Sequence, residues 1–232
     1  MSALVEINNI CKIYNPGENE VRALDHVSVS IDEGEFVAII GQSGSGKSTL
    51  MNMLGCLDVP TSGEYRLHGQ NVSELTDNEL SDIRNREIGF IFQGFNLIAN
   101  LTALENVELP LIYRGVPRGE RVRLARTALE KVGLGKRMEH KPAEMSGGQQ
   151  QRVAIARAIA QAPPIILADE PTGNLDSSST EEIMAILQEL YEEGRTVILI
   201  THNNEIADRA KRIIQIKDGK IESDTRTGTE NK

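Results

Sequence analysis

One glycine-rich loop, placed between an apolar run and a helix, constrains the fold of this chain more than any other feature. The loop fits the pattern Gly-x-x-x-x-Gly-Lys-Ser and consists of Gly41, Gln42, Ser43, Gly44, Ser45, Gly46, Lys47 and Ser48. Residues 36–40 before it form a continuous apolar run, which predicts a strand buried on both faces. Residues 48–54 after it predict a helix, so the loop leads from a buried strand to a helix N-terminus.

This loop has the chemistry of a phosphate-binding site. Glycines allow backbone N–H groups to turn toward phosphate oxygens, and the helix N-terminus adds about half a positive charge. Lys47 can reach the β- and γ-phosphates, and the Ser48 hydroxyl can bind Mg²⁺. We therefore expect residues 41–49, which end at Thr49, to bind a nucleotide with Mg²⁺ rather than to form a turn without a ligand. The loop alone does not separate a kinase, a GTPase and a transport ATPase.

Two carboxylates follow a second apolar run farther along the chain. Asp169 and Glu170 come directly after residues 165–168, which predict another buried strand. A carboxylate at such a strand end can hold Mg²⁺, and the next one can polarise a water for attack on the γ-phosphate. An acidic strand end that only faces solvent is the alternative, and the phosphate-binding loop makes the functional interpretation stronger.

The remaining pattern predicts a doubly wound α/β protein with a helical insert. Alternating apolar residues predict half-buried strands near the N-terminus, whereas residues 96–162 have helical character. Residues 197–200 predict a buried strand that follows an amphipathic helix, and buried parallel strands joined by helices form a doubly wound sheet. The polar residues 224–232 are expected to be frayed.

The overall composition and net charge favour a soluble globular protein. Hydrophobic residues make up 39% and charged residues 25%, and the net charge of -9 argues against non-specific nucleic-acid binding. Cys11 and Cys56 are too few for a metal or disulfide framework, so we expect reduced core thiols in a cytoplasmic protein. No apolar run approaches the roughly 18 residues of a membrane span, and the N-terminus lacks the features of a signal peptide. A membrane role is therefore expected to come through a partner.

A second glycine-rich element follows in the helical insert. Met145, Ser146, Gly147, Gly148 and Gln149 predict an N-capped helix whose amides can bind an anion. With this element the chain resembles the ATP-binding-cassette ATPases over nearly its whole length, although Leu is usual where Met145 stands. The resemblance implies that this signature motif contacts the γ-phosphate of ATP bound to the opposite subunit. Two copies are then expected to form an ATP-dependent homodimer around two Mg-ATP.

Other family residues can be matched one at a time. Tyr14 is similar to the aromatic residue that stacks on adenine, and Gln93 to the glutamine that senses Mg²⁺ and the attacking water. Leu175 and Asp176 fit the dimer-contact loop, and His202 resembles the switch histidine that touches the γ-phosphate. The resemblance thus implies a catalytic group of Glu170, His202 and Gln93. The metal ligands it implies are Ser48, Gln93 and Asp169.

The resemblance also implies a domain organisation. We expect a single ATPase domain over residues 1–232 with a RecA-like P-loop NTPase core, an N-terminal antiparallel β subdomain and an inserted α-helical subdomain. Residues 1–94 and 163–232 would form the core with the β subdomain. Residues 95–162, approximately, would form the helical subdomain that carries the signature motif.

The sequences of residues 102–110 and 168–176 resemble those of the macrolide-exporter and lipoprotein-release branch of the family. That branch implies a permease partner with few transmembrane helices and a large extracytoplasmic domain, and a location on the inner face of the cell membrane. Residues 95–98 and 101–107 stand where the family docks the permease, although plain packing of the insert explains any single residue there equally well. Drugs, peptides, lipoproteins and toxins all stay open as cargo.

Three other functions compete with transport. Non-transport cassettes act in translation or DNA repair, but those proteins usually fuse two cassettes or carry long coiled coils, which this sequence does not show. Relatives that signal across the membrane during cell division would look the same in sequence. A regulatory module without hydrolysis is disfavoured, because Lys47, Asp169, Glu170 and His202 are all present.

Overall fold

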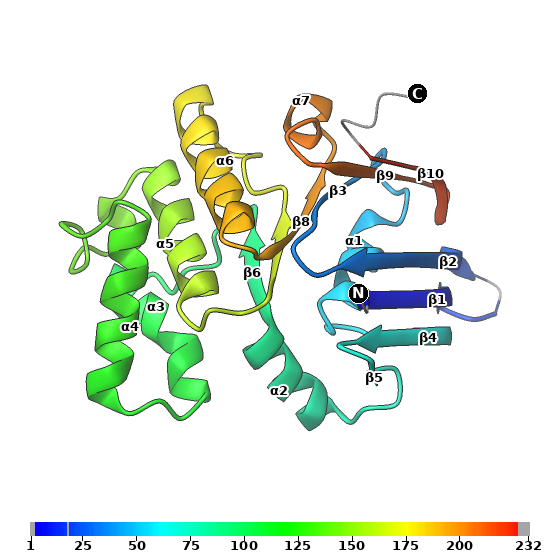
Figure 1. Cartoon of the computed structure of the whole chain (residues 1–232), viewed down its shortest axis with the longest axis horizontal. Helices are drawn as coiled ribbons and strands as arrows, with labels where there is room; N and C mark the ends of the chain where they lie inside the picture. Colours follow the sequence, from blue (N-terminus) through cyan, green and yellow to red (C-terminus); the bar gives the residue numbers. More distant parts are fainter. Residues whose placement is uncertain (1–2, 18, 227–232) are drawn as a thin grey trace. The chain divides into compact units, whose positions relative to one another are not determined.

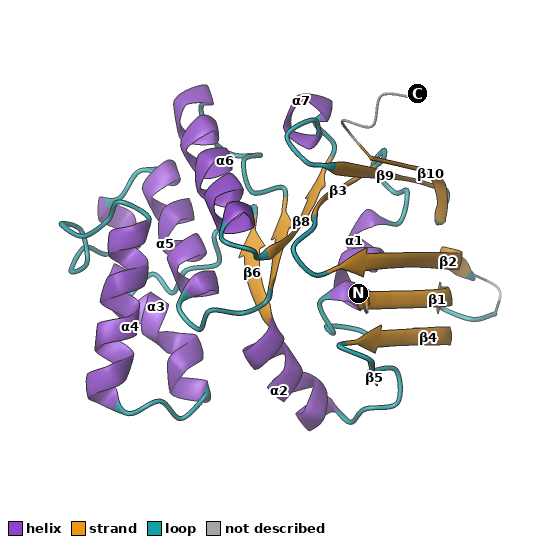
Figure 2. Ribbon diagram, viewed as in Figure 1, coloured by secondary structure: helices purple, strands orange, loops and turns teal. Residues whose placement is uncertain are grey.

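The structure is a computed structural model that describes residues 3–17 and 19–226. It divides into two compact units, which are Met1–Arg84 with Gly194–Lys232, and Asn85–Glu193. Figures 1 and 2 show the elements of both units. Helix α2 (Asp77–Glu87) runs across the boundary between them.

The first unit contains an antiparallel sheet at its N-terminal end (Figure 1). The strands have the order β2-β1-β4-β5. They are β1 (Ala3–Tyr14), β2 (Val21–Asp32), β4 (Ser62–Leu67) and β5 (Gln70–Asn71). Alternation of buried and exposed residues along β2 shows that one face of this sheet is packed and the other is solvated. This is the antiparallel β subdomain that the family resemblance implies.

The first unit also holds the strand that precedes the glycine-rich loop. This strand, β3 (Phe36–Ile40), pairs in parallel with β8 (Thr196–Thr201) and β9 (Arg212–Lys217), and β10 (Lys220–Arg226) is antiparallel to β9. Strand β8 is buried along its whole length, as its continuous apolar run predicts. The unit's helices are α1 (Lys47–Leu54) and the short α7 (Asn204–Ala207).

The second unit pairs two parallel strands and adds helices. Strand β6 (Ile88–Phe92) pairs with β7 (Ile165–Asp169) in an unbroken register. The helices are α3 (Ala103–Tyr113), α4 (Arg118–Lys131), α5 (Gly147–Ile159) and α6 (Ser177–Glu192), with a short 3-10 turn at Pro142–Glu144. The predicted apolar stripe on α6 is confirmed, because Ile183, Leu187 and Leu190 are all buried.

The predicted strands and helices of both units are found, but several other elements escaped prediction. These are β4, β5, β9, β10, α2 and α7. The expectation of a frayed end from residue 224 is wrong for Asp224–Arg226, which belong to β10, because Arg212 on β9 holds Asp224 with two hydrogen bonds. Residues 227–232 lie outside the described residues.

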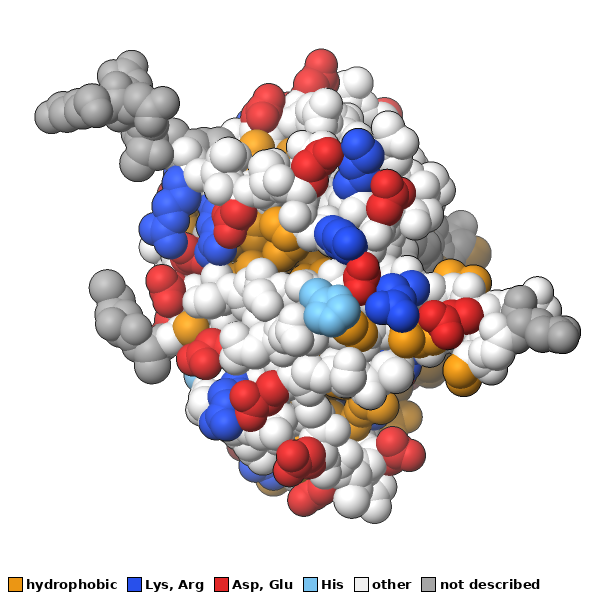
Figure 3. Space-filling model, turned by 90° about the vertical axis from the view of Figure 1, so that its right-hand side faces the viewer, with side chains coloured by type: hydrophobic (Ala, Val, Ile, Leu, Met, Phe, Trp, Pro, Cys, Tyr) orange, Lys and Arg blue, Asp and Glu red, His pale blue; other side chains and the backbone are white. Residues whose placement is uncertain are grey.

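In the face of the first unit shown in Figure 3, acidic and basic side chains are interspersed around exposed hydrophobic ones. Within residues 3–17 and 19–226, no helix combines the length and the apolar character that crossing a membrane requires.

Candidate functional site

The predicted phosphate-binding loop lies between β3 and α1, and glycine is required at both of its ends. Gly46 occupies the N-cap of α1 with a φ of 105°, and a Cβ there would lie 2.5 Å from the carbonyl oxygen of Ala23. A Cβ on Gly41 would lie 2.3 Å from the carbonyl oxygen of Ile216. Neighbouring backbone therefore encloses the loop so closely that a side chain at either position would displace it.

The loop fits a phosphate in charge and in hydrogen-bonding capacity. Lys47 Nζ donates hydrogen bonds to the carbonyl oxygens of Gly41 (2.7 Å) and Gln42 (2.8 Å), so its charge is held over the loop. The Oγ of Ser45 is buried and has no hydrogen-bond partner among the residues that the structure describes. The helix N-terminus points its free amides in the same region. The Lys47 charge and the helix N-terminus favour an anionic ligand here.

A pocket of about 400 Å³ opens beside this loop, within the usual size range of ligand pockets. Its lining includes Gly44 and residues 46–49, which were predicted. It also includes residues that the sequence did not indicate: Val21, Arg22, Ala23, Asp218 and Gly219. These residues come from the start of β2 and the turn between β9 and β10, and no motif marks them.

Tyr14 lies at the end of β1, near the helix that follows the loop. Partial burial raises the pKa of the Tyr14 phenol, the hydrogen bond with Asp58 raises it further, and a hydrogen bond with Thr49 opposes the change. Thr49 belongs to the predicted nucleotide loop, so the structure brings two predicted ligand contacts together. The Lys12 ammonium lies 5.1 Å from the centre of the Tyr14 ring, a cation–π distance.

His202 follows β8 in the first unit and is exposed. The next residue, Asn203, is the N-cap of α7, and its side-chain oxygen accepts a hydrogen bond of 2.9 Å from the Glu205 N–H. The N–H of Asn203 donates to the hydroxyl of Thr201. The backbone on the C-terminal side of His202 is therefore fixed by local caps.

In the second unit, the register of β6 and β7 places the predicted catalytic loops side by side. Phe92 pairs with Asp169, so Gln93 and Glu170 begin adjacent loops. Glu170 has a φ of 45°, a left-handed conformation that is uncommon outside glycine and concentrated at functional positions. A buried strand end thus carries Asp169 and Glu170 in defined backbone positions.

Gln93 is held by Asn174 through two reciprocal hydrogen bonds. The Gln93 side-chain amide donates to Asn174 Oδ1 at 3.3 Å, and the Asn174 amide donates to the Gln93 carbonyl oxygen at 3.2 Å. Gly173 is necessary for this arrangement, because a Cβ there would lie 2.6 Å from the Gln93 Nε2. Asn174 was not singled out from the sequence.

The second glycine-rich element caps α5 as predicted. Ser146 is the N-cap residue: its hydroxyl accepts from the Gln149 N–H (3.3 Å), and Gln149 Oε1 accepts from the Ser146 N–H (3.2 Å). Gly147 and Gly148 form the first helical positions. A Cβ on Gly147 would meet Leu175 and Phe95 at ordinary contact distances, 3.5 and 3.7 Å.

Asp176 is the N-cap of α6. Its two carboxylate oxygens accept hydrogen bonds from the N–H and the hydroxyl of Ser179, both at 2.9 Å. These hydrogen bonds hold the pKa of the Asp176 carboxyl below its ordinary value. Asp176 therefore caps α6, in addition to the dimer-contact role that the family resemblance implies.

The predicted docking segment contains both packed and exposed residues. Ala103, Leu104 and Val107 are buried and belong to the core, whereas Ile98 is 48% exposed. The buried Asn106 side chain hydrogen-bonds backbone groups of residues 98, 101 and 102 and shapes the segment. Phe95 and Leu97 are half-buried.

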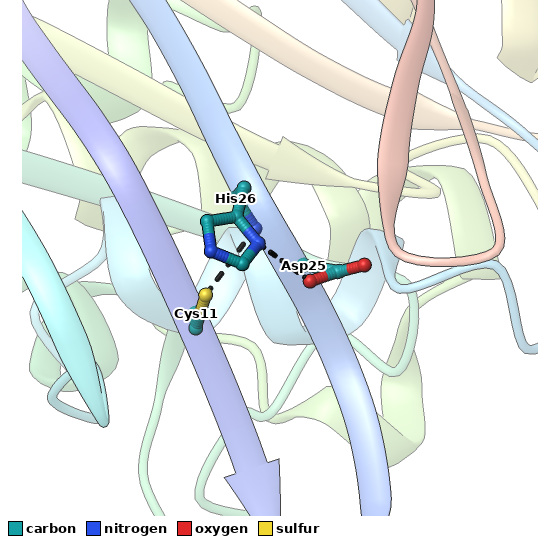
Figure 4. A group of neighbouring side chains, drawn as sticks. All are labelled: Cys11, Asp25 and His26. Carbon is teal, nitrogen blue, oxygen red and sulfur yellow. Dashed lines mark hydrogen bonds and ion pairs between the residues drawn. The ribbon is translucent and has the colours of Figure 1, made fainter.

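A cluster of three residues whose side chains can bind a metal ion lies outside the predicted site. Cys11 on β1 accepts a hydrogen bond from the N–H of His26 on β2 at 3.3 Å, and His26 Nδ1 lies 2.7 Å from Asp25 (Figure 4). Asp25 also pairs with Lys220 and Arg22. The 2.7 Å separation is a hydrogen bond, shorter than the roughly 3.3 Å between tetrahedral zinc ligands. We interpret the cluster as a cross-strand hydrogen-bond link.

The structure therefore groups the predicted residues in two sets. Tyr14, residues 41–49 and His202 belong to the first unit, and the remaining site residues belong to the second. The remaining residues are Gln93, Ser146, Gly147, Gly148, Gln149, Asp169, Glu170 and Asp176. Both cysteines are buried with free thiols, as expected of core residues.

The chain is similar in sequence to proteins of one known family. A family profile described as ABC transporter matches residues 24–173. The macrolide export ATP-binding/permease protein MacB of Hyphomonas neptunium is 56% identical over 222 residues, which are 96% of this chain and 34% of that protein. The chain thus spans about a third of the length of this relative. An ABC transporter ATP-binding protein of Thermotoga maritima is 54% identical over 228 residues, 98% of this chain and 97% of that one.

A solved structure agrees with the fold. It is the ATP-binding cassette MJ0796, described as a dimer in a post-hydrolysis state bound to ADP and Pi. Its TM-score is 0.88 at 50% sequence identity, and the match covers 96% of this chain and 98% of that one.

Proposed function

The chain belongs to the ABC transporter family, and from this premise we propose that it is the ATP-hydrolysing motor subunit of a transporter. The observation that carries the proposal is the loop of Gly41 to Ser48, in which Lys47 is held over a glycine-lined pocket at a helix N-terminus. The likeness to a dimeric cassette bound to ADP and Pi supports the same ligand class. The nucleotide is ATP with Mg²⁺.

In this proposal, each ligand group has its own protein contacts. The Tyr14 ring stacks on adenine, and residues 41–49 bind the phosphates. Ser48, Gln93 and Asp169 are the residues that would hold Mg²⁺, which neutralises charge on the phosphates when it is bound. The Ser45 Oγ, which is buried without a hydrogen-bond partner among the described residues, and the N-terminal amides of α1 fit an anionic ligand.

Hydrolysis uses the loops after β6, β7 and β8. Glu170 accepts a proton from the attacking water, and Gln93 and His202 orient the water and the γ-phosphate. Two copies close head to tail, so that Ser146, Gly147, Gly148 and Gln149 of one contact the γ-phosphate held by the other. Asp176 lies at the contact between the copies. Product release reopens the homodimer.

We also propose which part of the chain forms each subdomain and which part contacts the permease. Residues 1–94 and 163–232 act as the ATP-binding core with the β subdomain, and residues 95–162, approximately, as the helical subdomain. The segment around Phe95, Leu97 and Ile98 docks a membrane permease, supported by the exposure of Ile98 and by the named export function of the MacB relatives. The partner is a permease of the macrolide/peptide-export or lipoprotein-release type, with few transmembrane helices and a large extracytoplasmic domain. The chain then works on the inner face of the cell membrane.

The experiment that tests the function compares three purified proteins in a steady-state ATPase assay with Mg²⁺. Wild type and Glu189→Gln, a matched change at an exposed position on α6, should hydrolyse ATP at similar rates. Glu170→Gln should bind ATP but turn over at least about a hundredfold more slowly, and it should elute as a dimer with ATP. Equal turnover by Glu170→Gln and wild type contradicts the assignment of Glu170.

The same variant identifies the partner. Glu170→Gln is affinity-purified from detergent-solubilised membranes with Mg-ATP, and co-purifying proteins are identified. An integral membrane protein with few spans and a large external domain supports the transport proposal. Recovery of ribosomes, DNA or soluble partners alone places the chain among non-transport cassettes.

A further inference from the structure

The side chain of Gln151 links the signature helix to both catalytic loops of the second unit. Gln151 lies on α5 and is fully buried, with 0% exposure. Its amide nitrogen donates hydrogen bonds to the carbonyl oxygens of Phe92 (3.3 Å) and Pro171 (2.7 Å). Phe92 immediately precedes Gln93, and Pro171 immediately follows Glu170. One amide group therefore bridges the two backbone segments that present the proposed catalytic residues.

The orientation of this amide is dictated by its surroundings. Both partners are carbonyl oxygens, so the NH₂ group must face them, because the reverse orientation would bring oxygen against oxygen. The other end, Oε1, is buried and lacks a hydrogen-bond partner within the described part of the chain. An apolar side chain of similar shape, such as Met, would fill the space without this unsatisfied oxygen. What Gln provides at this position and Met does not is the pair of hydrogen bonds to the Phe92 and Pro171 carbonyl oxygens.

Other contacts show that α5 is held closely against β6 and the loop that follows it. Gly89 on β6 allows this approach, because a Cβ there would lie 2.6 Å from the carbonyl oxygen of Ala158. Farther along α5, Arg157 donates hydrogen bonds to the carbonyl oxygens of Phe95 (2.9 Å) and Asn96 (2.5 Å). The chain is thus anchored to α5 on both sides of Gln93.

The conformation of Glu170 makes such an anchor necessary. Its φ of 45° is uncommon for a non-glycine residue and persists only where the surrounding structure holds it. The turn after it closes through the Gly173 N–H to the Glu170 carbonyl oxygen at 3.0 Å. Gln151 holds the next carbonyl, that of Pro171, and so adds a second hydrogen bond that fixes the turn.

We propose that Gln151 is a positioning residue for ATP hydrolysis: its amide sets Gln93 and Glu170 relative to the signature helix α5. The proposal rests on the proposed function, since it uses the catalytic roles given to those two residues. Movement of α5, when its N-terminus meets the γ-phosphate of the other copy, would be transmitted through Gln151 to both loops. Gln151 itself touches neither the nucleotide nor the attacking water.

The test replaces Gln151 by Met in the full chain and measures kcat, KM and ATP affinity. Gln188→Met, the same chemical change on α6, is the control. For Gln151→Met we expect kcat to fall about tenfold to a hundredfold, because loss of alignment at the reacting groups has costs of this size. The dissociation constant for ATP should stay within about threefold of wild type. The melting temperature should change little, because removal of the unsatisfied Oε1 offsets the loss of the hydrogen bond to the buried Pro171 carbonyl oxygen.

A second variant supplies a pH readout. In Gln151→Glu, an ionised carboxylate faces two carbonyl oxygens, whereas a protonated one can donate a single hydrogen bond. Its kcat relative to wild type should therefore rise as the pH falls. A ratio that decreases as the pH falls contradicts the bridging role.

The outcomes separate this inference from the proposed function. If wild type hydrolyses ATP, Glu170→Gln does not, and Gln151→Met works at the wild-type rate, only the role of Gln151 is overturned. A fall in kcat that is matched by an equal loss of ATP affinity shows a general structural role and also overturns it. If wild type does not hydrolyse ATP, the proposed function itself fails.

Discussion

The Tyr14 hydroxyl donates a 3.0 Å hydrogen bond to Asp58, a residue in the loop after α1. The other oxygen of Asp58 accepts a 2.7 Å hydrogen bond from Lys12, whose ammonium lies over the Tyr14 ring. Partial burial tends to raise the pKa of Asp58, but its hydrogen bonds, first of all that from Lys12, leave it lowered. The ring is therefore held at its hydroxyl, and a cation lies over one of its faces.

This arrangement predicts that the ring of Tyr14, more than its hydroxyl, binds adenine. Tyr14→Ala should weaken ATP binding by roughly 1–3 kcal/mol, the usual contribution of base stacking on an aromatic side chain. Tyr14→Phe keeps the ring and should stay within about threefold of wild type. Titration with a fluorescent ATP analogue measures both. Equal losses in the two variants would show that the hydroxyl, through Asp58, is the important group.

Removing the loop cation should weaken nucleotide binding without unfolding the protein. Lys47→Ala deletes a charge whose hydrogen bonds go to two carbonyl oxygens of the loop and, in our proposal, to phosphate. Hydrogen bonds to charged groups contribute about 1.5–3 kcal/mol, so ATP affinity should fall roughly tenfold to a hundredfold. Calorimetric titration with Mg-ATP measures the loss, with the exposed Lys211→Ala as control. Matching affinities in the two variants contradict the role of Lys47.

The two glycines of the signature motif should respond differently to alanine. A Cβ on Gly148 would lie 2.5 Å from Ser179 Oγ and 2.9 Å from Ser179 Cβ, whereas a Cβ on Gly147 finds ordinary contacts. Gly148→Ala should therefore destabilise the fold by about 1–3 kcal/mol through overpacking, while Gly147→Ala should be neutral or slightly stabilising. Urea unfolding of both variants gives the comparison. The prediction fails if the two free energies of unfolding are equal.

The Cys56 thiol predicts a pH dependence of stability. Burial raises the pKa of Cys56 to about 11, from an ordinary value of 9.0, although a hydrogen bond with Tyr65 opposes the change. Because the folded value is the higher one, this contribution to stability is complete below about pH 9 and is lost as the pH rises toward 11. The free energy of unfolding should fall by roughly 2–3 kcal/mol across that interval because of this thiol.

The variant Cys56→Ala isolates the contribution of this thiol to the pH dependence of stability. Alanine suits the left-handed backbone of residue 56 no worse than cysteine does, since both carry a Cβ. Urea unfolding of wild type and variant from pH 8 to pH 11 should show a steeper decline for wild type. Parallel pH profiles would exclude Cys56 as the titrating group.

Local sequence signals predicted much of the fold and of the nucleotide loop. The run of residues 36–40, the glycines after it and the cap at Ser146 act over a few neighbouring residues, so they can be read without the fold. Elements with weak local signals were missed. Strand β5 has only two residues, and α2 is so polar that a single residue, Leu80, is buried.

The sequence by itself determined the residue types and spacings on which the family assignment and the proposed chemistry depend. Only the tertiary structure decided what lies beside them: Asp58 at Tyr14, Asn174 at Gln93, and Gln151 between Phe92 and Pro171. These contacts join residues far apart in the chain, and a polar residue gives no local sign of its distant partner. Strand register and helix packing create such pairs, because burial of the apolar faces brings the strand ends together.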